Sequence, residues 1–144
     1  MVTNADIIGL AISGRTAQTT TGNMSTEHYR PEFYRYGSPY SGYLPQRLRD
    51  ILDTSFRAGA IDQVIYSYST PIAWRDNGQW IIPRVTYSQT TSSKHQSQLY
   101  RLSNAEYIPW DCGLEEYERV IGGLMRYVPW NGKYGEWIPT EVSA

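Results

Sequence analysis

Apolar residues recur at helical spacing in the first part of the chain. Thr3 and Asp6 form the pattern of a capping box, and apolar residues then follow close to one helical face as far as Gly14. These apolar positions are Ile7, Ile8, Ala11 and Ile12. The spacing predicts a helix over residues 3–14.

Two further stretches have amphipathic spacing. One begins at Pro45, which the first turn of a helix tolerates, and ends before Gly59, so it predicts a helix over residues 45–58. Its apolar positions are Leu48, Ile51, Leu52 and Phe56. The other predicts a helix over residues 114–127, in which Gly122 and Gly123 each cost about 1 kcal/mol relative to alanine.

The pattern changes to the β type in the middle of the chain. Residues 64–74 are rich in β-branched and aromatic side chains that alternate between two faces, which predicts a strand. Asn77–Gly78 then predicts a hairpin turn, because both central residues of a type I′ turn need a positive φ. The return strand is expected over residues 79–87. Pro83 predicts that this strand is an edge or carries a bulge, because proline cannot donate to a ladder.

The remaining stretches have weaker patterns. Residues 15–43 predict an extended region with one short strand or turn, and residues 90–102 predict a helix with a thin apolar face. A second Asn-Gly pair lies between Trp130 and Trp137 and predicts another hairpin. The fold class expected from these elements is α+β. We expect a small single domain over residues 1–144, with an antiparallel sheet around the Asn-Gly hairpin packed by two to four helices.

Composition narrows the kind of protein. The 144 residues include 13 Tyr and 5 Trp but 2 Phe, and rings with a polar group suit half-buried sheet faces and binding surfaces. A net charge of -1 removes the whole-chain argument for nucleic-acid binding. No apolar run approaches the roughly 20 residues of a membrane span, and the N-terminus lacks a secretory pattern. We therefore expect a soluble intracellular protein with no membrane partner.

Candidate chemistry concentrates in residues 87–96. This segment places hydroxyls, a cation and an imidazole where the helix over residues 90–102 is expected to start. The residues are Thr90, Thr91, Ser92, Lys94 and His95. Unpaired backbone N–H groups and the helix dipole favour an anion at such a place, so the segment predicts a phosphate site. The alternative is that Thr90 or Thr91 only caps the helix and that His95 packs nearby.

Other chemistries find less support in the sequence. Two histidines and the single Cys112 lack the clustered spacing of a metal site, and no cofactor motif is present. A hydrolase built on His95 would need a hydroxyl or carboxylate partner. Ser88, Ser92 and Asp111 have suitable side chains, but their spacing selects none of them. A non-enzymatic role therefore ranks first.

Three segments occur in a characteristic order: Gly22–Ser25, then YSYSTPIA at residues 66–73, then YSQTTSSKHQ at residues 87–96. This combination resembles a family of small proteins with a domain of unknown function, encoded by bacteriophages and mobile elements, in which YSY.TPIA and YS.TTS.H motifs recur. The resemblance covers residues 3–26 and 64–102. Residues 27–62, with the helix over 45–58, then form an insertion. Residues 103–144 form a C-terminal extension with a helix and a Trp-rich tail.

The resemblance implies a phage-encoded protein that acts on a host component in the host cytoplasm. We expect it to bind a phosphate-bearing ligand without catalysis, for example a nucleotide immune signal that it sequesters for anti-defence. Thr90, Thr91, Ser92, Lys94 and His95 would hold the phosphate. Tyr66, Tyr68 or Trp74 would lie near the base.

Two alternative functions stay open. A protein-binding inhibitor of a host factor would use the Trp-rich tail and a Tyr-rich segment that contains Tyr34, Tyr36, Tyr40 and Tyr43. A DNA- or RNA-binding accessory protein would need several basic residues on one surface. These are Arg47, Arg49, Arg57, Arg84, Lys94 and Arg101. Exposed aromatic residues and the expected edge strand also make a homo-oligomer an open expectation.

Overall fold

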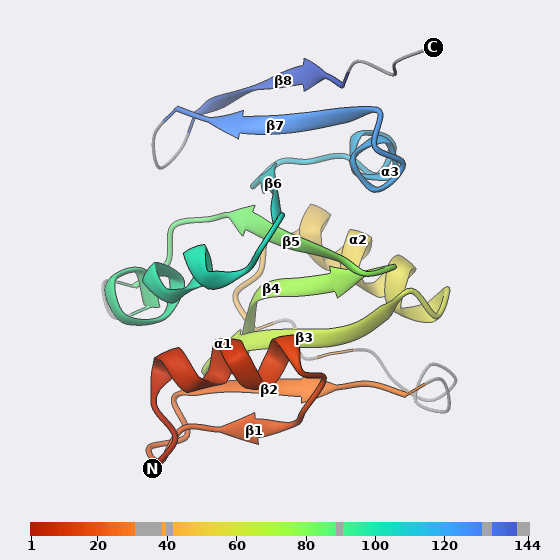
Figure 1. Ribbon diagram of the computed structural model, residues 1–144. Coiled ribbons are helices and arrows are strands. Elements are labelled where there is room, and N and C mark those ends of the chain that lie inside the picture. Colours follow the sequence, from red (N-terminus) through yellow and green to blue (C-terminus); the bar gives the residue numbers. More distant parts are fainter. Residues whose placement is uncertain (31–38, 40–41, 89–90, 131–133, 141–144) are drawn as a thin grey trace.

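The computed structural model describes residues 1–30, 39, 42–88, 91–130 and 134–140 (Figure 1). Its α-helices are α1 (Asn4–Ile12), α2 (Gln46–Arg57) and α3 (Leu114–Ile121). A π-helical turn, η2 (Thr91–His95), leads directly into a 3-10 helix, η3 (Gln96–Arg101). The strands are β1 (Ala17–Gln18), β2 (Met24–His28), β3 (Ile61–Ser67), β4 (Thr70–Asp76), β5 (Gln79–Arg84), β6 (Glu106–Pro109), β7 (Met125–Pro129) and β8 (Gly135–Pro139).

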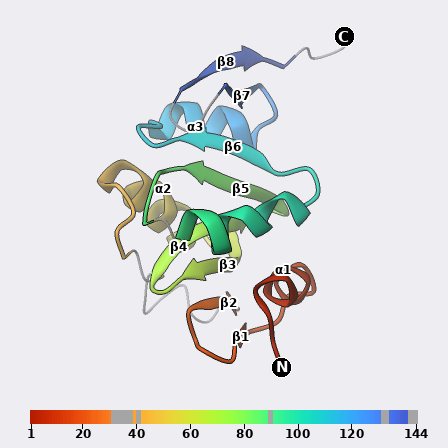
Figure 2. The ribbon, with the colours of Figure 1, turned by 90° about the vertical axis from the view of Figure 1, so that its left-hand side faces the viewer.

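The strands of the described residues join one sheet in the same order that they have along the chain, from β1 to β8. Neighbouring strands are antiparallel except for β5 and β6, which are parallel. The chain segment that joins this parallel pair carries η2 and η3 (Figure 2). The predicted α+β class is therefore confirmed, with a mostly antiparallel sheet.

The middle of the sheet is buried on both faces. One face packs Val64 and Trp74 against α2 and α3, and the other packs Ile65 and Ala73 against α1 and η3. Figures 1 and 2 show α1 and α2 on opposite sides of the sheet. Because successive side chains of a strand point to opposite faces, the alternation in β3 supplies two separate cores. The sheet is thus the middle one of three layers.

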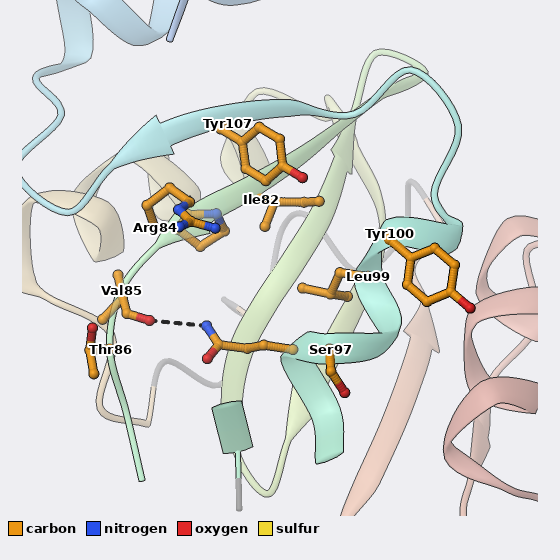
Figure 3. A pocket seen from close by; sticks show the side chains of 10 residues that line it. Ile82, Arg84, Val85, Thr86, Ser97, Leu99, Tyr100 and Tyr107 are labelled. Carbon is orange, nitrogen blue, oxygen red and sulfur yellow. Dashed lines mark hydrogen bonds between the residues drawn. The ribbon is translucent and has the colours of Figure 1, made fainter. Parts of the chain in front are cut away.

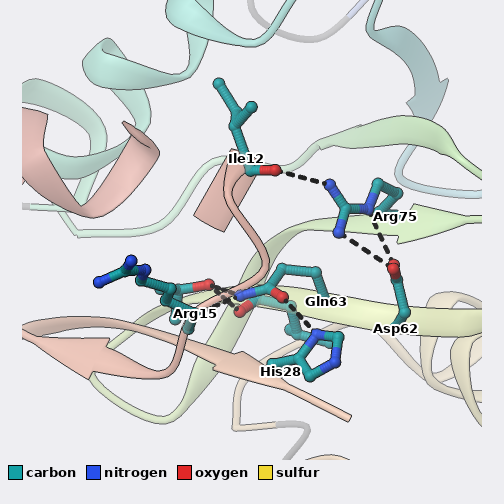
Figure 4. Close-up of polar contacts among 8 residues, drawn as sticks. Ile12, Arg15, His28, Asp62, Gln63 and Arg75 are labelled. Carbon is teal, nitrogen blue, oxygen red and sulfur yellow. Dashed lines mark hydrogen bonds and ion pairs between the residues drawn. The ribbon is translucent and has the colours of Figure 1, made fainter. Parts of the chain in front are cut away.

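Polar contacts fasten α1 to the sheet. The predicted capping box forms, because Thr3 and Asp6 each accept a hydrogen bond from the backbone N–H of the other. At the far end of α1, Arg75 of β4 donates to the Ile12 carbonyl at 3.2 Å, and the same guanidinium pairs with Asp62 at 2.8 and 3.0 Å (Figure 4). Arg75 therefore satisfies a carbonyl that the last helical turn leaves unpaired.

A buried amide ties the N-terminal strands to β3. The Gln63 side chain is fully buried, and its Nε2 donates to the Arg15 carbonyl and to Thr26 Oγ1, each at 2.8 Å. Its Oε1 lies 3.1 Å from His28 Nδ1 (Figure 4). All the polar atoms of this amide are paired, as burial of such a group requires.

The Asn-Gly hairpin joins β4 to β5. Asn77 and Gly78 have φ values of 49° and 82°, the positive values that a type I′ turn needs. The prediction of one strand over residues 64–74 is wrong, because β3 ends at Ser67 and the chain turns at Tyr68–Ser69 before β4 begins. Tyr68 has a φ of 55°, which is unusual for a bulky residue, and neither turn residue is glycine or asparagine.

The return strand also differs from its prediction. β5 ends at Arg84 rather than at residue 87, and it lies between β4 and β6 rather than at an edge. Pro83 is tolerated inside the sheet because the ladder between β5 and β4 ends at Ile81. From there to Arg84, β5 pairs only with β6.

Three other predicted elements need correction. The helix over residues 114–127 ends at Ile121, because Gly123 takes a φ of 74°, and the chain continues as β7. Within the stretch predicted as a helix over residues 90–102, residues 91–101 form η2 and η3 instead of a regular α-helix. Residues 15–43 contain two strands, β1 and β2, while the part of this stretch at residues 31–38, 40 and 41 lies outside the described residues.

None of the helices found in the described ranges combines the length and the apolar character that a membrane span needs.

Gly78→Ala and Gly9→Ala form a matched pair of tests of the hairpin turn, because a Cβ at either position would meet no atom within 4 Å. Only the backbone differs, since Gly78 has a φ of 82° and Gly9 lies within α1. We expect Gly78→Ala to lower the free energy of unfolding by about 1 kcal/mol, the typical cost of a left-handed alanine. Gly9→Ala should raise it by up to about 1 kcal/mol. Urea titrations measure the free energy of unfolding of both variants. Changes of the same sign would contradict a left-handed conformation at Gly78.

Candidate functional site

Hydrogen-bonded hydroxyl groups link the end of β3 to η2. Ser67 Oγ lies 2.6 Å from His95 Nδ1 and 2.9 Å from Thr91 Oγ1. Thr91 in turn accepts a hydrogen bond from Ser88 Oγ at 3.1 Å, and its backbone N–H donates to Ser88 Oγ at 3.3 Å. Ser67, Ser88, Thr91 and His95 together form the hydroxyl–imidazole cluster.

One arrangement of protons satisfies every group of this cluster. In it Ser88 donates to Thr91, Thr91 donates to Ser67, and Ser67 donates to Nδ1 of a neutral His95. The His95 side chain is only 2% exposed, and this burial, followed by the nearby Lys94 cation, lowers the pKa of His95 from its ordinary 6.5. Both arguments give the same neutral imidazole.

Beside the cluster lies a pocket of about 750 Å³, within the range typical of small-molecule sites. Tyr43, Tyr68 and Tyr87 line it, and we call it the tyrosine pocket. Three members of the cluster, Ser67, Ser88 and Thr91, also belong to its lining. None of the described residues in the lining is charged. The pocket thus suits a flat, largely uncharged group with several hydrogen-bonding atoms.

The loop before α2 holds one wall of the tyrosine pocket. Arg49 of α2 donates to the carbonyls of Leu44 at 2.6 Å and Gly42 at 2.7 Å, and Thr70 Oγ1 accepts the N–H of Tyr43 at 3.0 Å. Gly42, with a φ of 44°, packs so closely on Thr70 that a Cβ would overlap the strand. These contacts fix the backbone at Tyr43, whose side chain is 86% exposed.

Two features of the lining are energetically costly. The Tyr87 hydroxyl is buried and has no hydrogen-bond partner among the described residues, a cost of about 1–3 kcal/mol for such a group. Burial raises the pKa of Tyr87, so the phenol keeps its proton and remains a donor. The positive φ of Tyr68 is a second cost. Strained backbone and unpaired buried polar groups are often found at functional sites, and here both occur in the lining of one pocket.

A second pocket, of about 410 Å³, shares Val85 and Thr86 with the tyrosine pocket and is lined by parts of β5, β6 and η3 (Figure 3). In this pocket the guanidinium carbon of Arg84 lies 5.6 Å from the centroid of the Tyr107 ring. Gln96 Nε2 donates to the Val85 carbonyl at 3.0 Å and so holds η3 beside the end of β5. This arginine pocket, as we call it, brings a cation next to the uncharged tyrosine pocket.

Part of the predicted phosphate site comes together. Thr91 and His95 lie in the cluster, and Tyr68 lines the tyrosine pocket, with its ring centroid 5.7 Å from that of His95. Lys94 is exposed and does not belong to that lining, and its carbonyl accepts a hydrogen bond from the Asn4 side chain at 3.1 Å.

The other predicted site residues lie elsewhere. Tyr66 and Trp74 are buried in the core that packs against α2 and α3, on the other face of the sheet. Trp74 Nε1 donates to the Tyr117 hydroxyl at 3.0 Å, so Trp74 serves the core. Thr90 lies outside the described residues, and Ser92 is described only as backbone within η2.

The basic residues predicted for nucleic-acid binding do not gather on one surface. Arg47, Arg49 and Arg57 belong to α2, whereas Arg101 belongs to η3, which packs against the opposite face of the sheet. Arg49 is also occupied with backbone carbonyls.

Residues 12–111 match the family described as "Family of unknown function (DUF8033)", which is more than half of the chain. The chain belongs to this family. The match contains the whole hydroxyl–imidazole cluster and runs through residues 27–62, whose assignment as an insertion stays a prediction. No curated protein and no solved structure matches the chain. Because the family description assigns no activity, a function for this DUF8033 member has to be argued from the geometry.

Thiol and metal chemistry receive no support from this geometry. Burial raises the pKa of the Cys112 thiol to about 12, which keeps it protonated and unreactive. Within the described part of the chain, no group of three or more His, Cys, Asp or Glu side chains is placed to hold a metal ion.

We expect His95 to make the protein less stable in mildly acidic solution. The unfolded imidazole takes up a proton as the pH falls through its ordinary pKa of 6.5, whereas the folded protein holds His95 neutral. Proton uptake then favours unfolding, so the free energy of unfolding should be level above about pH 7 and fall below about pH 6.5. Urea titrations across this range should show a shallower decline for His95→Gln. Parallel curves for the two proteins would rule out a neutral buried ring.

Proposed function

We propose that this protein binds a small ring-bearing ligand in the tyrosine pocket and that the ligand also carries phosphate, as a nucleotide does. The observation that carries the proposal is a pocket large enough for such a ring, whose lining includes Tyr87, a residue with a buried hydroxyl that has no partner among the described residues. Binding alone defines this function, and it needs no chemical step.

The lining supports a flat heterocycle as the buried part of the ligand. Aromatic side chains that stack on a base contribute about 1–3 kcal/mol per base, and both Tyr43 and Tyr68 expose large ring areas, with exposed fractions of 86% and 52%. A shift of the Tyr87 side chain on binding would bring its enclosed hydroxyl to a ring nitrogen or oxygen of the ligand, to which it would donate. Bound in this way, a base would remove the cost of the unpaired donor.

The phosphate would lie outside the uncharged pocket and near a cation. Lys94 is exposed on η2, only three residues after Thr91 of the pocket lining. Arg84 lines the adjoining arginine pocket. Either side chain would pair with a phosphate through charge-assisted hydrogen bonds, and variants at the two positions distinguish them.

The resemblance to phage-encoded proteins supports a biological setting for this binding. We propose that the protein works in the host cytoplasm and sequesters a nucleotide signal of host immunity. A sponge of this kind needs affinity but no turnover, which suits a pocket built around stacking and hydrogen bonding.

Calorimetric titration with the four common ribonucleosides tests the ring site. We expect one nucleoside to bind and Tyr87→Phe, which removes only the hydroxyl, to weaken its binding about tenfold, the equivalent of one hydrogen bond. Tyr134→Phe is the control, because it removes the hydroxyl of a tyrosine that lines neither the tyrosine pocket nor the arginine pocket. Failure of every nucleoside and nucleotide to bind would refute the proposal.

The same titration with linear and cyclic nucleotides tests the phosphate. A phosphate-bearing form should bind more tightly than its nucleoside, and Lys94→Ala or Arg84→Ala should remove that difference while leaving nucleoside affinity unchanged. Inorganic phosphate alone reports whether the cation holds the anion without the ring. Equal affinities for nucleoside and nucleotide would confine the function to binding of an uncharged ligand.

A second candidate function, inhibition of a host protein, is favoured by apolar exposure at the C-terminal hairpin. Trp130, Leu124 and Ile138 are 65%, 54% and 37% exposed on or beside β7 and β8. Exposed aromatic and aliphatic side chains of this kind anchor protein interfaces. If nucleotides leave the melting temperature unchanged and Trp130→Ala abolishes binding of a purified host protein, this candidate replaces the first.

A further inference from the structure

The hydroxyl–imidazole cluster contains a nucleophile with its base. Ser67 is a lining residue of the tyrosine pocket and is 2% exposed, and its Oγ lies 2.6 Å from His95 Nδ1. A serine hydroxyl becomes an effective nucleophile when a neutral imidazole accepts its proton at this distance. When Ser67 donates to Nδ1 of the neutral ring, the pair has the protonation state that this reaction needs.

The surroundings hold this pair rigidly. Ser67 is the last residue of β3, directly before the turn at Tyr68–Ser69, and its oxygen is hydrogen-bonded to Thr91 Oγ1 at 2.9 Å. His95 is buried at the junction of η2 and η3, where the Tyr68 ring lies beside it. A nucleophile and base fixed by a strand and a packed turn meet the geometric requirement for attack on a bound substrate.

Two lining residues carry hydroxyls that are candidate donors for the negative charge that such an attack creates. The Tyr87 hydroxyl keeps its proton and has no partner among the described residues. Thr70 Oγ1 accepts the N–H of Tyr43 and can donate its own proton. Both side chains line the pocket together with Ser67. Hydroxyl donors placed near a reacting carbonyl stabilise the oxyanion of the tetrahedral intermediate.

We propose that Ser67 is an acyl-accepting nucleophile, with His95 as its general base, for a carboxylic ester whose aromatic or heterocyclic part lies in the tyrosine pocket. This inference goes beyond ligand binding and rests on the same pocket, but it needs no phosphate.

The reaction would proceed in two stages. The Ser67 oxygen bonds to the ester carbonyl carbon while its proton passes to His95 Nδ1. The bond from that carbon to the leaving oxygen then breaks, and the leaving oxygen takes the proton from His95. In the second stage a water molecule attacks the acyl-serine, gives its proton to His95, and the Ser67 oxygen leaves with that proton. The products are the alcohol and the carboxylic acid, and no oxidant or reductant is needed.

The test uses 4-nitrophenyl acetate with the full chain. We expect a burst of 4-nitrophenol and a single acetyl group on Ser67, located by peptide mass spectrometry. Ser67→Ala should abolish the burst, and His95→Gln should slow acylation by about 100-fold or more, the usual contribution of a general base. Ser69→Ala is the matched control, because Ser69 belongs to the same lining but not to the hydroxyl–imidazole cluster, and this variant should keep the burst.

A second variant separates reactivity from a purely structural role of the pair. Ser67→Cys keeps the hydrogen bond to His95, and we expect iodoacetamide to alkylate its thiol at neutral pH, with Ser67→Cys/His95→Gln reacting only in alkaline solution. Peptide mass spectrometry separates labelling at residue 67 from labelling at Cys112, which should stay unlabelled at neutral pH because its pKa is raised to about 12. Far-ultraviolet circular dichroism confirms that each variant is folded.

The outcomes distinguish this inference from the binding function. Acetylation confined to lysine or to other hydroxyls, or equal rates in the wild type and His95→Gln, overturns the nucleophile even if a nucleoside binds. If Ser67 is acylated but no nucleoside or nucleotide binds, the assignment of Ser67 as a nucleophile is supported and the proposed binding function is refuted.

Discussion

Strands β3 and β4 bury apolar side chains on both faces, so each face of the sheet has to pack against helices. Helices α2 and α3 cover one face, while α1 and the segment with η2 and η3 cover the other. Because that segment lies over the sheet between β5 and β6, these two strands run parallel. The segment with η2 and η3 buries polar side chains against the sheet. The hydrogen bonds among Ser67, Thr91 and His95 satisfy these side chains. The candidate site therefore lies where the segment with η2 and η3 packs against the end of β3.

Local signals in the sequence predict the elements whose conformation is decided locally. The capping box at Thr3 and the amphipathic pattern of α2 both appear where expected. The positive φ values at Asn77 and Gly78 agree with the predicted turn. Local signals fail where distant contacts decide. Tyr68 turns without a glycine because its N–H bonds to the Asn23 carbonyl at 2.7 Å, a contact that sequence spacing does not contain.

The candidate site divides in the same way. The hydroxyl-rich segment predicts Thr91 and His95, because capping hydroxyls and an imidazole are visible in one short run of sequence. Ser67 lies inside the YSYSTPIA motif. Its hydrogen bond to His95 depends on how the segment with η2 and η3 packs on the sheet, which the spacing of residues in the sequence does not predict. Trp74 shows the opposite error, since aromatic character alone does not separate a core residue from a ligand contact. Tyr87 belongs to the hydroxyl-rich segment at residues 87–96. Its hydroxyl lacks a partner because of how the folded chain buries it, which the sequence does not show.

The agreement between strand order in the sheet and strand order in the chain has a consequence for folding kinetics. Each pairing joins consecutive strands, so the entropy lost on closing loops stays small, and the hairpins β3–β4, β4–β5 and β7–β8 can form from nearby residues. The parallel pair β5–β6 has to wait until the intervening segment folds back across the sheet. The tyrosine pocket and the Ser67–His95 contact depend on that segment and are completed late. A chain arrested before this step would contain its hairpins but no ligand site.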